Sequence, residues 1–395
     1  MPSRLSTSTD PTARTARNAV GASFALNGLI FATLVSRLPD IRHDLGLSNT
    51  MLGVLLFAGS AGSMLALPIS GRVIERISPA PTVRLGTAMV TLGLLTLAIG
   101  ATAVDVFAVA LAGNLVYGMG VSLWDVAMNL EGAEVERRLG RTIMPRFHAG
   151  WSIGSIAGSA LGIPMAALHV PVVLHCLVVL LVAAGLTVHG SRSFLPVEPK
   201  VEEPTARVSA WREPRTLMIG VLVLCFAIVE GSANDWLSLA IIDGYDTPHW
   251  VGVAGFSGFV IAMTVGRLLA PFALDRVGRA PMLWASAAAS AVGVLVAVYG
   301  GSLPVMFAGI VLWGLGSALG FPVGISAAAD DPARAAARVS VVASVAYTAF
   351  FVGPPLLGML GDRVGTLQAL TVVALLMVPA AFAVLAARPP RTASR

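Results

Sequence analysis

Charged residues are scarce in this chain of 395 residues, because only 12% of its positions are charged whereas 56% are hydrophobic. Soluble domains typically hold about 25% charged and about 45–50% apolar residues. Apolar runs of around twenty residues recur along the whole length, and a helix of that length crosses the hydrocarbon core of a bilayer. We therefore expect an all-α membrane protein with many spans.

Cysteines and catalytic motifs are also rare or missing. The two cysteines, Cys176 and Cys225, lie in separate apolar runs, which favours packing over a metal or redox role. The sequence contains no G-x-x-x-x-G-K-S/T phosphate loop and no H-E-x-x-H, so it offers no motif for ATP-driven transport or for a zinc hydrolase of that type. We expect a protein that is not an enzyme, with no cofactor and no metal.

Twelve membrane spans are predicted, six on each side of a polar stretch. The predicted parts are a disordered tail (1–17), an N-terminal six-helix bundle (18–189), a linker (190–215), a C-terminal six-helix bundle (216–387) and a second tail (388–395). The expected spans are 18–38, 49–71, 82–102, 106–128, 146–168, 170–189, 216–242, 250–274, 281–300, 303–327, 336–360 and 366–387.

The basic residues predict the orientation of these spans. The two tails, the linker and the alternate loops on the same side hold 22 of the 26 lysines and arginines, and the opposite side holds Arg37, Arg42 and Arg363. Basic residues concentrate in cytoplasmic loops. We expect a multi-pass protein of the inner (cytoplasmic) membrane with both termini in the cytoplasm, and the net charge of +5 then gives no sign of nucleic-acid binding.

The two halves of the chain share sequence patterns. An Ala-Gly pair, three residues, an aromatic residue, Gly, an apolar residue and Gly stand at 112–120 and again at 308–316. The acid–arginine pairs Glu75-Arg76 and Asp275-Arg276 follow the second and eighth spans. Matching halves are typical of transporters, which bind their solute between the halves near the middle of the membrane.

These loops resemble the major facilitator superfamily, whose cytoplasmic motif is roughly G-x-x-x-D-R-x-G-R. The motif is nearly complete at 275–279 and degenerate at 71–78. The segments 123–132, 135–141, 147–152 and 230–236 resemble the MosC/YbjJ branch, one member of which is linked to uptake of a rhizopine, an inositol-type compound. The resemblance implies a twelve-helix transporter that works by alternating access.

Polar residues in the first half suggest part of a binding site. Asp125 and Asn129 share a helix face, with Asp125 about 27 Å along its span. Asp125 is either a gate or coupling carboxylate that lines a cavity, or a member of a structural network with arginines such as Arg137, Arg138 or Arg146. His148 and Trp151 lie on one stripe of the fifth span with Ser152, Ser155 and Ser159. For the serines we favour close helix packing, whereas for Trp151 and His148 helix packing and contact with a sugar-like ligand have equal support.

Glu230 lies at the centre of the seventh span, where a charge is expensive and usually functional. We favour a proton-carrying role for it over the alternative of a buried acid that braces two helices. Asn234 follows one turn later, and we expect Arg267 to extend from the eighth span toward the cytoplasm. The predicted substrate or proton-binding residues are Asn27, Asp125, Asn129, His148, Trp151, Glu230, Asn234, Asp235 and Trp236. The predicted gating residues are Arg37, Asp40, Gly71, Glu75, Arg76, Asp275 and Arg276.

The resulting expectation is a secondary transporter for a small polar solute, sugar-like or cyclitol-like, with the proton as coupling ion and a monomer as the working unit. The alternatives are an efflux antiporter for a drug or metabolite and a membrane sensor that does not transport. Drug/proton antiporters carry Arg where Asn114 stands and Pro where Ser159 stands, which weakens the antiporter interpretation.

Overall fold

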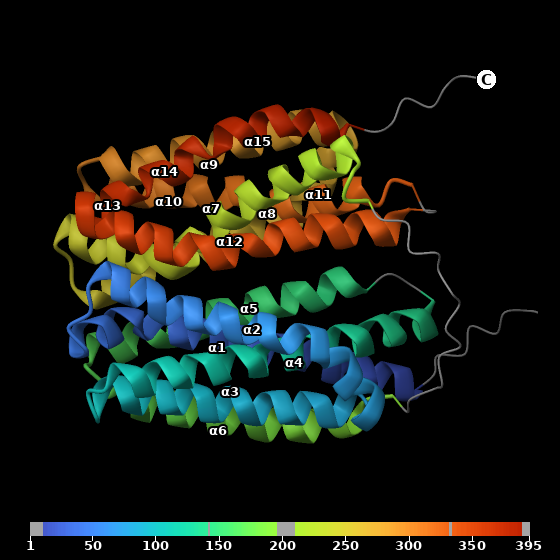
Figure 1. The fold of residues 1–395 in the computed structure, drawn as a ribbon, viewed down its shortest axis with the longest axis horizontal. Coiled ribbons are helices and arrows are strands. Elements are labelled where there is room, and N and C mark those ends of the chain that lie inside the picture. Colours follow the sequence, from blue (N-terminus) through green and yellow to red (C-terminus); the bar gives the residue numbers. More distant parts are fainter. Residues whose placement is uncertain (1–10, 141–142, 196–209, 332–333, 389–395) are drawn as a thin grey trace, which may run out of the picture. The chain divides into compact units, whose positions relative to one another are not determined.

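The computed structural model describes residues 11–140, 143–195, 210–331 and 334–388. All regular secondary structure in these ranges is helical (Figure 1). The first half contains α1 (Pro11–Asp44), α2 (Asn49–Ile77), α3 (Pro79–Thr102), α4 (Phe107–Leu139), α5 (Met144–Ala167), α6 (Val172–Gly190) and the short η1 (Ser191–Ser193). Each predicted span of this half is therefore a helix.

The second half repeats this order with two interrupted spans. It contains α7 (Pro214–Tyr245), α8 (His249–Val277), α9 (Arg279–Tyr299), α10 (Leu303–Ser317), α11 (Gly320–Ala328), α12 (Ala335–Val364), α13 (Thr366–Ala369), α14 (Thr371–Leu375), α15 (Met377–Ala383) and η2 (Val384–Ala387). The helices α10 and α11 form the tenth predicted span, and the pieces from α13 to η2 form the twelfth. The break before α11 has a clear cause, because Pro322 lacks the N–H that would bond the carbonyl of residue 318.

The first helix is longer than predicted. It begins at Pro11, so residues 11–17, which we expected in a disordered tail, are helical. The remaining tail residues 1–10, most of the predicted linker (196–209) and residues 389–395 lie outside the described part of the chain.

Eleven helices in the described ranges are long and apolar enough to cross a membrane. The helix α5 is not among them, although its 24 residues correspond to about 36 Å at about 1.5 Å per residue. It carries His148, Ser152, Ser155 and Ser159, which lower its apolar content. Together with α5, the described ranges contain the twelve membrane helices of two six-helix bundles.

The outer surface of α6 shows how the protein meets lipid. Leu174, Val178, Leu181, Val182 and Leu186 are each more than half exposed. Such a stripe of exposed aliphatic side chains would be unfavourable in water but suits the hydrocarbon core of a bilayer.

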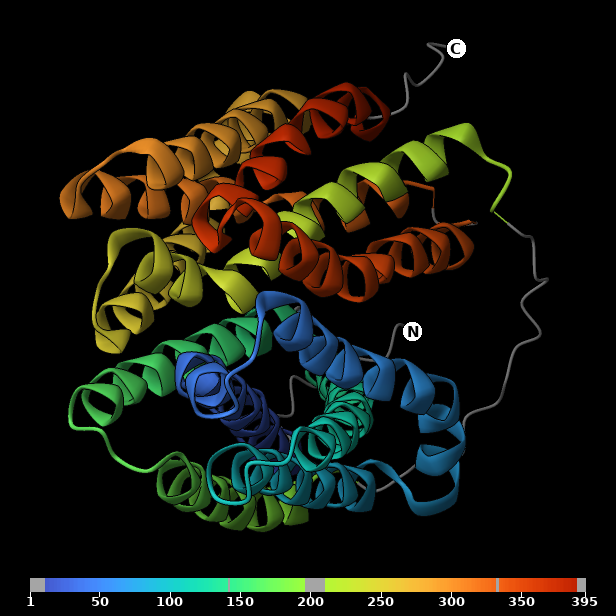
Figure 2. The same ribbon diagram turned by 60° about the vertical axis from the view of Figure 1, so that its left-hand side comes forward.

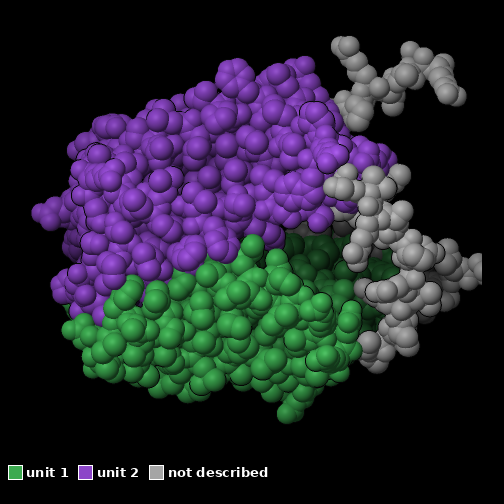
Figure 3. Space-filling model, viewed as in Figure 1, with its two compact units in different colours: residues 1–37, 58–201 green, residues 38–57, 202–395 purple. Residues whose placement is uncertain are grey.

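The chain forms two compact units (Figure 3). Residues 1–37 and 58–201 belong to the first unit, and residues 38–57 and 202–395 belong to the second. The second unit thus includes residues 38–57, the end of α1 and the beginning of α2, and the predicted boundary at the linker stays a prediction.

The repeated glycine pattern has a structural cause inside each unit. A methyl group at Gly113 of α4 would lie 2.4 Å from the backbone nitrogen of Leu97 in α3, and one at Gly309 of α10 would lie 2.5 Å from that of Ala297 in α9. The pairs α3–α4 (Figure 2) and α9–α10 therefore cross in backbone contact at matching positions. Close approach through glycine is a common way to join membrane helices.

Candidate functional site

In the first unit, Asn27 of α1 and Trp151 of α5 are joined by a hydrogen bond. The Trp151 indole Nε1–H donates to Asn27 Oδ1 over 3.1 Å. The two helices approach closely here, since a methyl group at Gly28 would lie 2.1 Å from the carbonyl oxygen of Trp151 and one at Gly154 would lie 1.8 Å from that of Ala25. The sequence predicted both residues as site residues, and the structure brings them together.

Aromatic rings surround this pair. The ring of Phe31 lies 5.4 Å from that of Trp151, and the ring of Phe24 lies 5.1 Å from that of His148 in an edge-on arrangement. Asn27 is nearly buried, Trp151 is partly exposed and His148 is exposed. The site thus combines an indole face, an imidazole and an amide on one side of the first unit.

The serines of α5 have a different role. Ser155 and Ser159 are fully buried. The Ser155 hydroxyl donates to the carbonyl of Gly28, and the Ser159 hydroxyl donates to that of Ser155. This arrangement agrees with our interpretation that the serines serve helix packing.

Asp125 and Asn129 of α4 form a pair at the helix surface. The Asn129 amide donates to Asp125 Oδ1 over 3.1 Å and to the Asp125 backbone carbonyl over 2.9 Å. The structural alternative required an arginine such as Arg137, Arg138 or Arg146. Arg137 and Arg138 bond Glu134, and Arg146 is exposed. Among the described residues, Asp125 has no ion pair, and its role stays a prediction.

The side chain next to Asp125 anchors this part of α4 on α1. Trp124 is fully buried, and its indole Nε1–H donates to the hydroxyl of Ser23 over 2.8 Å. Since Asp125 is the following residue and is exposed, it lies away from the packed side of the helix. Ser23 was not predicted, because nothing in its local sequence indicates that it contacts Trp124.

In the second unit, Glu230 of α7 forms an ion pair with Arg267 of α8. The Arg267 Nη2 lies 3.0 Å from both carboxylate oxygens of Glu230. Arg267, which we expected to extend toward the cytoplasm, therefore contacts a carboxylate of the neighbouring helix. The pair also gives weight to the alternative in which Glu230 braces two helices, and the role of Glu230 stays a prediction.

Asp235 stands in a different environment, five residues further along α7. It lines a small cavity of about 10 Å³ with Ser232 and Gly231 of α7 and with Phe350 and Gly353 of α12. This volume holds about one water molecule. Among the described residues, Asp235 has no hydrogen bond or ion pair, so its carboxylate faces the cavity uncompensated.

The other predicted residues of α7 separate into two kinds. Trp236 is fully buried, and a methyl group at Gly358 of α12 would lie 3.2 Å from its ring. The side chain of Trp236 thus belongs to the packing between α7 and α12 and is a poor candidate for solute contact. Asn234 is partly exposed.

The predicted gating residues occupy helix ends. Arg37 is buried and donates to the backbone carbonyl of Val170, whereas Asp40 contacts His249 at 3.1 Å. At the other end of the helices, the exposed predicted residues are Gly71, Glu75, Arg76 and Arg276. The side chain of Asp275 lies outside the described part of the structure.

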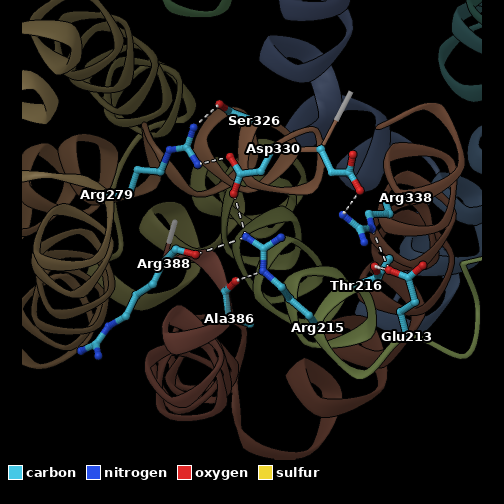
Figure 4. A network of polar contacts seen from close by, with 10 residues as sticks. Glu213, Arg215, Thr216, Arg279, Ser326, Asp330, Arg338, Ala386 and Arg388 are labelled. Atoms are coloured by element: carbon cyan, nitrogen blue, oxygen red, sulfur yellow. Dashed lines mark hydrogen bonds and ion pairs between the residues drawn. The ribbon is translucent and has the colours of Figure 1, made fainter. Parts of the chain in front are cut away.

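The last arginine of the loop motif belongs to an extended charge network that sequence reasoning missed (Figure 4). Arg279 of α9 lies 2.5 Å and Arg215 of α7 lies 2.7 Å from the two carboxylate oxygens of Asp330. Burial alone would raise the pKa of Asp330, but the two guanidinium groups outweigh it and hold the pKa below its usual value. The network therefore joins α7, α9 and the end of α11 through one ionised carboxylate.

A second carboxylate joins α7 to α12 beside it (Figure 4). Glu213 bonds Arg338 at 2.7 Å and Arg334 at 2.5 Å. Burial opposes the charge of Glu213, but the arginines outweigh it, so that its pKa is also lowered. No group of three or more His, Cys, Asp or Glu side chains in the described ranges could hold a metal ion.

Two bundles of membrane helices with internally matching helix crossings define a polytopic membrane protein of the transporter class. The chain matches the model of the Major Facilitator Superfamily over residues 20–257 and 249–395. It belongs to this family, as the loop motif indicated.

Relatives of known sequence agree with this assignment. The chain is 31% identical over 346 residues to the uncharacterized transporter y4wD of Sinorhizobium fredii, covering 87% of this chain and 90% of the relative. It is 26% identical over 365 residues to the membrane protein MosC of Rhizobium meliloti, covering 92% and 88%. The MosC similarity confirms the resemblance drawn from residues 123–152.

Solved structures share the fold. The nucleoside transporter NupG superposes with a TM-score of 0.73 at 15% identity, covering 95% of this chain and 99% of that one. A bacterial homologue of the human lysosomal transporter Spinster gives a TM-score of 0.75 at 14% identity, covering 96% and 98%. At this identity the likeness establishes the fold alone.

Proposed function

We propose that this transporter moves a small polar solute of the sugar or cyclitol type, driven by the proton gradient across the inner membrane. The observation that carries the solute class is the Asn27–Trp151 pair with His148 nearby. An indole face stacks on the apolar face of a ring, and neighbouring amide and imidazole groups bond hydroxyls. The working unit in this proposal is a monomer with both termini in the cytoplasm.

The solute class is tested by uptake into proteoliposomes of a panel of cyclitols, hexoses and nucleosides. Trp151→Phe retains an aromatic face but loses the bond to Asn27, whereas Trp151→Leu loses the face as well. We expect Trp151→Leu to abolish uptake and Trp151→Phe to weaken it by about tenfold, the factor that about 1.4 kcal/mol represents. Ile153→Leu, on the exposed side of the same helix, serves as the control. Full uptake by Trp151→Leu would remove this pair from the solute site.

Three carboxylates within spans are candidates to carry the proton: Asp125, Glu230 and Asp235. Our leading candidate remains Glu230. Arg267 can stabilise the ionised carboxylate of Glu230, and the ion pair can break when that carboxylate is protonated. A carboxylate that is neutral in one state and ionised when water enters links proton release to opening. The support is the bidentate contact between Glu230 and Arg267 at 3.0 Å.

Glu230→Gln mimics a permanently protonated carboxyl. We expect it to abolish accumulation driven by an imposed pH gradient while solute exchange without a gradient continues. Asp125→Asn, predicted to act at the inner gate, should impair both modes. Full gradient-driven uptake by Glu230→Gln would move the coupling role to Asp235 or Asp125, and Asp235→Asn then becomes the deciding variant.

A further inference from the structure

The small cavity beside Asp235 lies wholly inside the second unit, where α7 and α12 pack side by side. Ser232 and Asp235 of α7 face Phe350, Gly353 and Pro354 of α12 across it. None of the described residues that line this cavity is basic. The carboxylate of Asp235 therefore finds no cation of the protein there.

Ser232 brings to the cavity an oxygen atom whose hydrogen is already used. Its hydroxyl donates to the carbonyl of Ile228, one turn earlier on α7, over 2.6 Å. A hydroxyl has one hydrogen to donate and two lone pairs that accept. The Ser232 oxygen can therefore bind a cation or accept a hydrogen bond, but it has no hydrogen left for the carboxylate of Asp235.

Pro354 leaves a backbone carbonyl of α12 without its helical partner. A residue inside an α-helix donates its N–H to the carbonyl four residues earlier, and proline has no N–H. Pro354 stands inside α12, so the carbonyl of Phe350 lacks this bond. Since Phe350 and Pro354 both line the cavity, the carbonyl lies on the face of α12 that borders it. A methyl group at Gly353 would have nothing within 4 Å, which leaves the space beside this carbonyl open.

The cavity thus has oxygen acceptors on both sides and no matching donor. The carboxylate of Asp235, the hydroxyl of Ser232 and the carbonyl of Phe350 all offer lone pairs, and the N–H groups inside both helices are used by the helices themselves. A buried carboxylate without a partner is strongly unfavourable. Oxygen atoms around one negative charge are what hard cations bind, and carbonyls released in broken membrane helices coordinate Na⁺ in transporters of other folds.

We propose that Asp235, the Ser232 hydroxyl and the Phe350 carbonyl form a binding site for one Na⁺ ion between α7 and α12. The single carboxylate balances a single positive charge. The cavity of about 10 Å³ holds about one water-sized particle, whereas Ca²⁺ takes six to eight oxygen ligands and Mg²⁺ keeps several of its waters. The bound ion neutralises Asp235 and joins the two helices, and Glu230 keeps the proton.

The site is tested by binding of radioactive Na⁺ to the purified full-length protein in detergent, with choline chloride holding the ionic strength constant. No solute and no pH gradient are needed, so the result is independent of the proposed function. We expect saturable binding of one ion per chain, displaced by unlabelled Na⁺ but not by the larger K⁺. Asp235→Asn should abolish this binding, and Ser232→Ala should weaken it by about tenfold or more, because a ligand to a charged group is lost. Asp246→Asn, which changes an exposed carboxylate just after α7, is the control and should bind like the wild type.

The two neighbouring prolines of α12 provide a matched comparison. Pro354→Ala supplies an N–H for the carbonyl of Phe350 and should weaken the binding of Na⁺. Pro355→Ala supplies one for the carbonyl of Phe351, which does not border the cavity, and should leave the binding unchanged. Melting temperatures measured without Na⁺ show whether each variant is folded, and the variants of α7 decide the question should Pro354→Ala not fold.

Three results would each overturn the site. The first is a wild-type protein that shows no saturable binding of Na⁺, in which case a proton or water alone meets Asp235. The second is full binding by Asp235→Asn. The third is an equal effect of the two proline variants, which would remove the Phe350 carbonyl from the set of ligands.

Discussion

Replacing Gly93 by alanine tests the helix crossing that shapes the first unit. The new methyl carbon would lie 2.3 Å from the Tyr117 nitrogen, 2.7 Å from its Cα and 2.8 Å from the Gly113 carbonyl oxygen. Non-bonded carbon contacts are favourable at about 3.5–4.0 Å, so α3 and α4 must separate by roughly 1 Å. All three obstacles are backbone atoms, which cannot turn aside as a side chain does.

Inserting a methyl group into a packed site costs about 1–3 kcal/mol. One kcal/mol shifts the melting temperature of a domain of 150–250 residues by about 2–4 °C. We therefore expect Gly93→Ala to lower the melting temperature by several degrees, measured by tryptophan fluorescence of the purified protein in detergent. Gly293→Ala should do the same in the second unit, since its methyl group meets the Trp313 nitrogen at the same distance of 2.3 Å.

Gly185→Ala is the matched control, because a methyl group there has nothing within 4 Å on α6. It should leave the melting temperature unchanged or raise it slightly, since alanine is about 1 kcal/mol more favourable than glycine inside a helix. If Gly93→Ala melts at the wild-type temperature, the two helices can part without cost and the crossing is not what holds them.

Two other predictions follow from the charge network and the orientation. The pKa of Asp330 is lowered in the folded protein, so its ion pairs contribute stability at neutral pH, and that contribution is lost as the pH falls below the ordinary aspartate value of about 3.9. Melting temperatures measured from pH 7 to pH 3 should fall less steeply in Asp330→Asn than in the wild type, and an identical slope would contradict this. The orientation is tested with single cysteines at positions 192 and 104. In intact cells an impermeant maleimide should label Val104→Cys but not Arg192→Cys. The reverse pattern would invert the predicted topology. Both positions are accessible to the reagent, because Arg192 is exposed, unlike its buried neighbour Ser191, and Val104 is half exposed.

Local composition was enough to predict the helices. Twenty-residue apolar runs, the charge-rich loops and the repeated glycine pattern each identified a span or a pair of spans, because these signals lie within one stretch of chain. The same reasoning ended the first span at residue 38, before the helix end at Asp44, and missed its start at Pro11, since the Ser, Thr and Arg content of that region is typical of a tail.

Contacts between residues far apart in the sequence could not be predicted. Arg267 lies 37 residues from Glu230, and Asp330 lies 115 residues from Arg215. Periodicity shows which residues share a face of one helix but not which neighbouring helix that face meets. For the same reason the sequence could not show that Arg42 pairs with Asp243, 201 residues away.

The pairing of charges changes how the three carboxylates in the spans should be weighed. An ionised carboxylate at the centre of a membrane helix costs about 2.5–3.5 kcal/mol on insertion scales. Arg267 offsets this cost at Glu230, whereas no cation among the described residues pairs with Asp125 or Asp235. The latter two must therefore meet water, a bound cation or a proton. Asp235, which lines the small cavity, is therefore the strongest competitor to Glu230 as the proton carrier.

Glu230→Gln leaves the charge of Arg267 uncompensated, so it has to be compared with the double variant Glu230→Gln/Arg267→Gln. Should Glu230→Gln impair exchange as well as coupling, recovery of exchange alone in the double variant would assign the defect in exchange to the uncompensated charge of Arg267 and the defect in coupling to the loss of the Glu230 carboxyl.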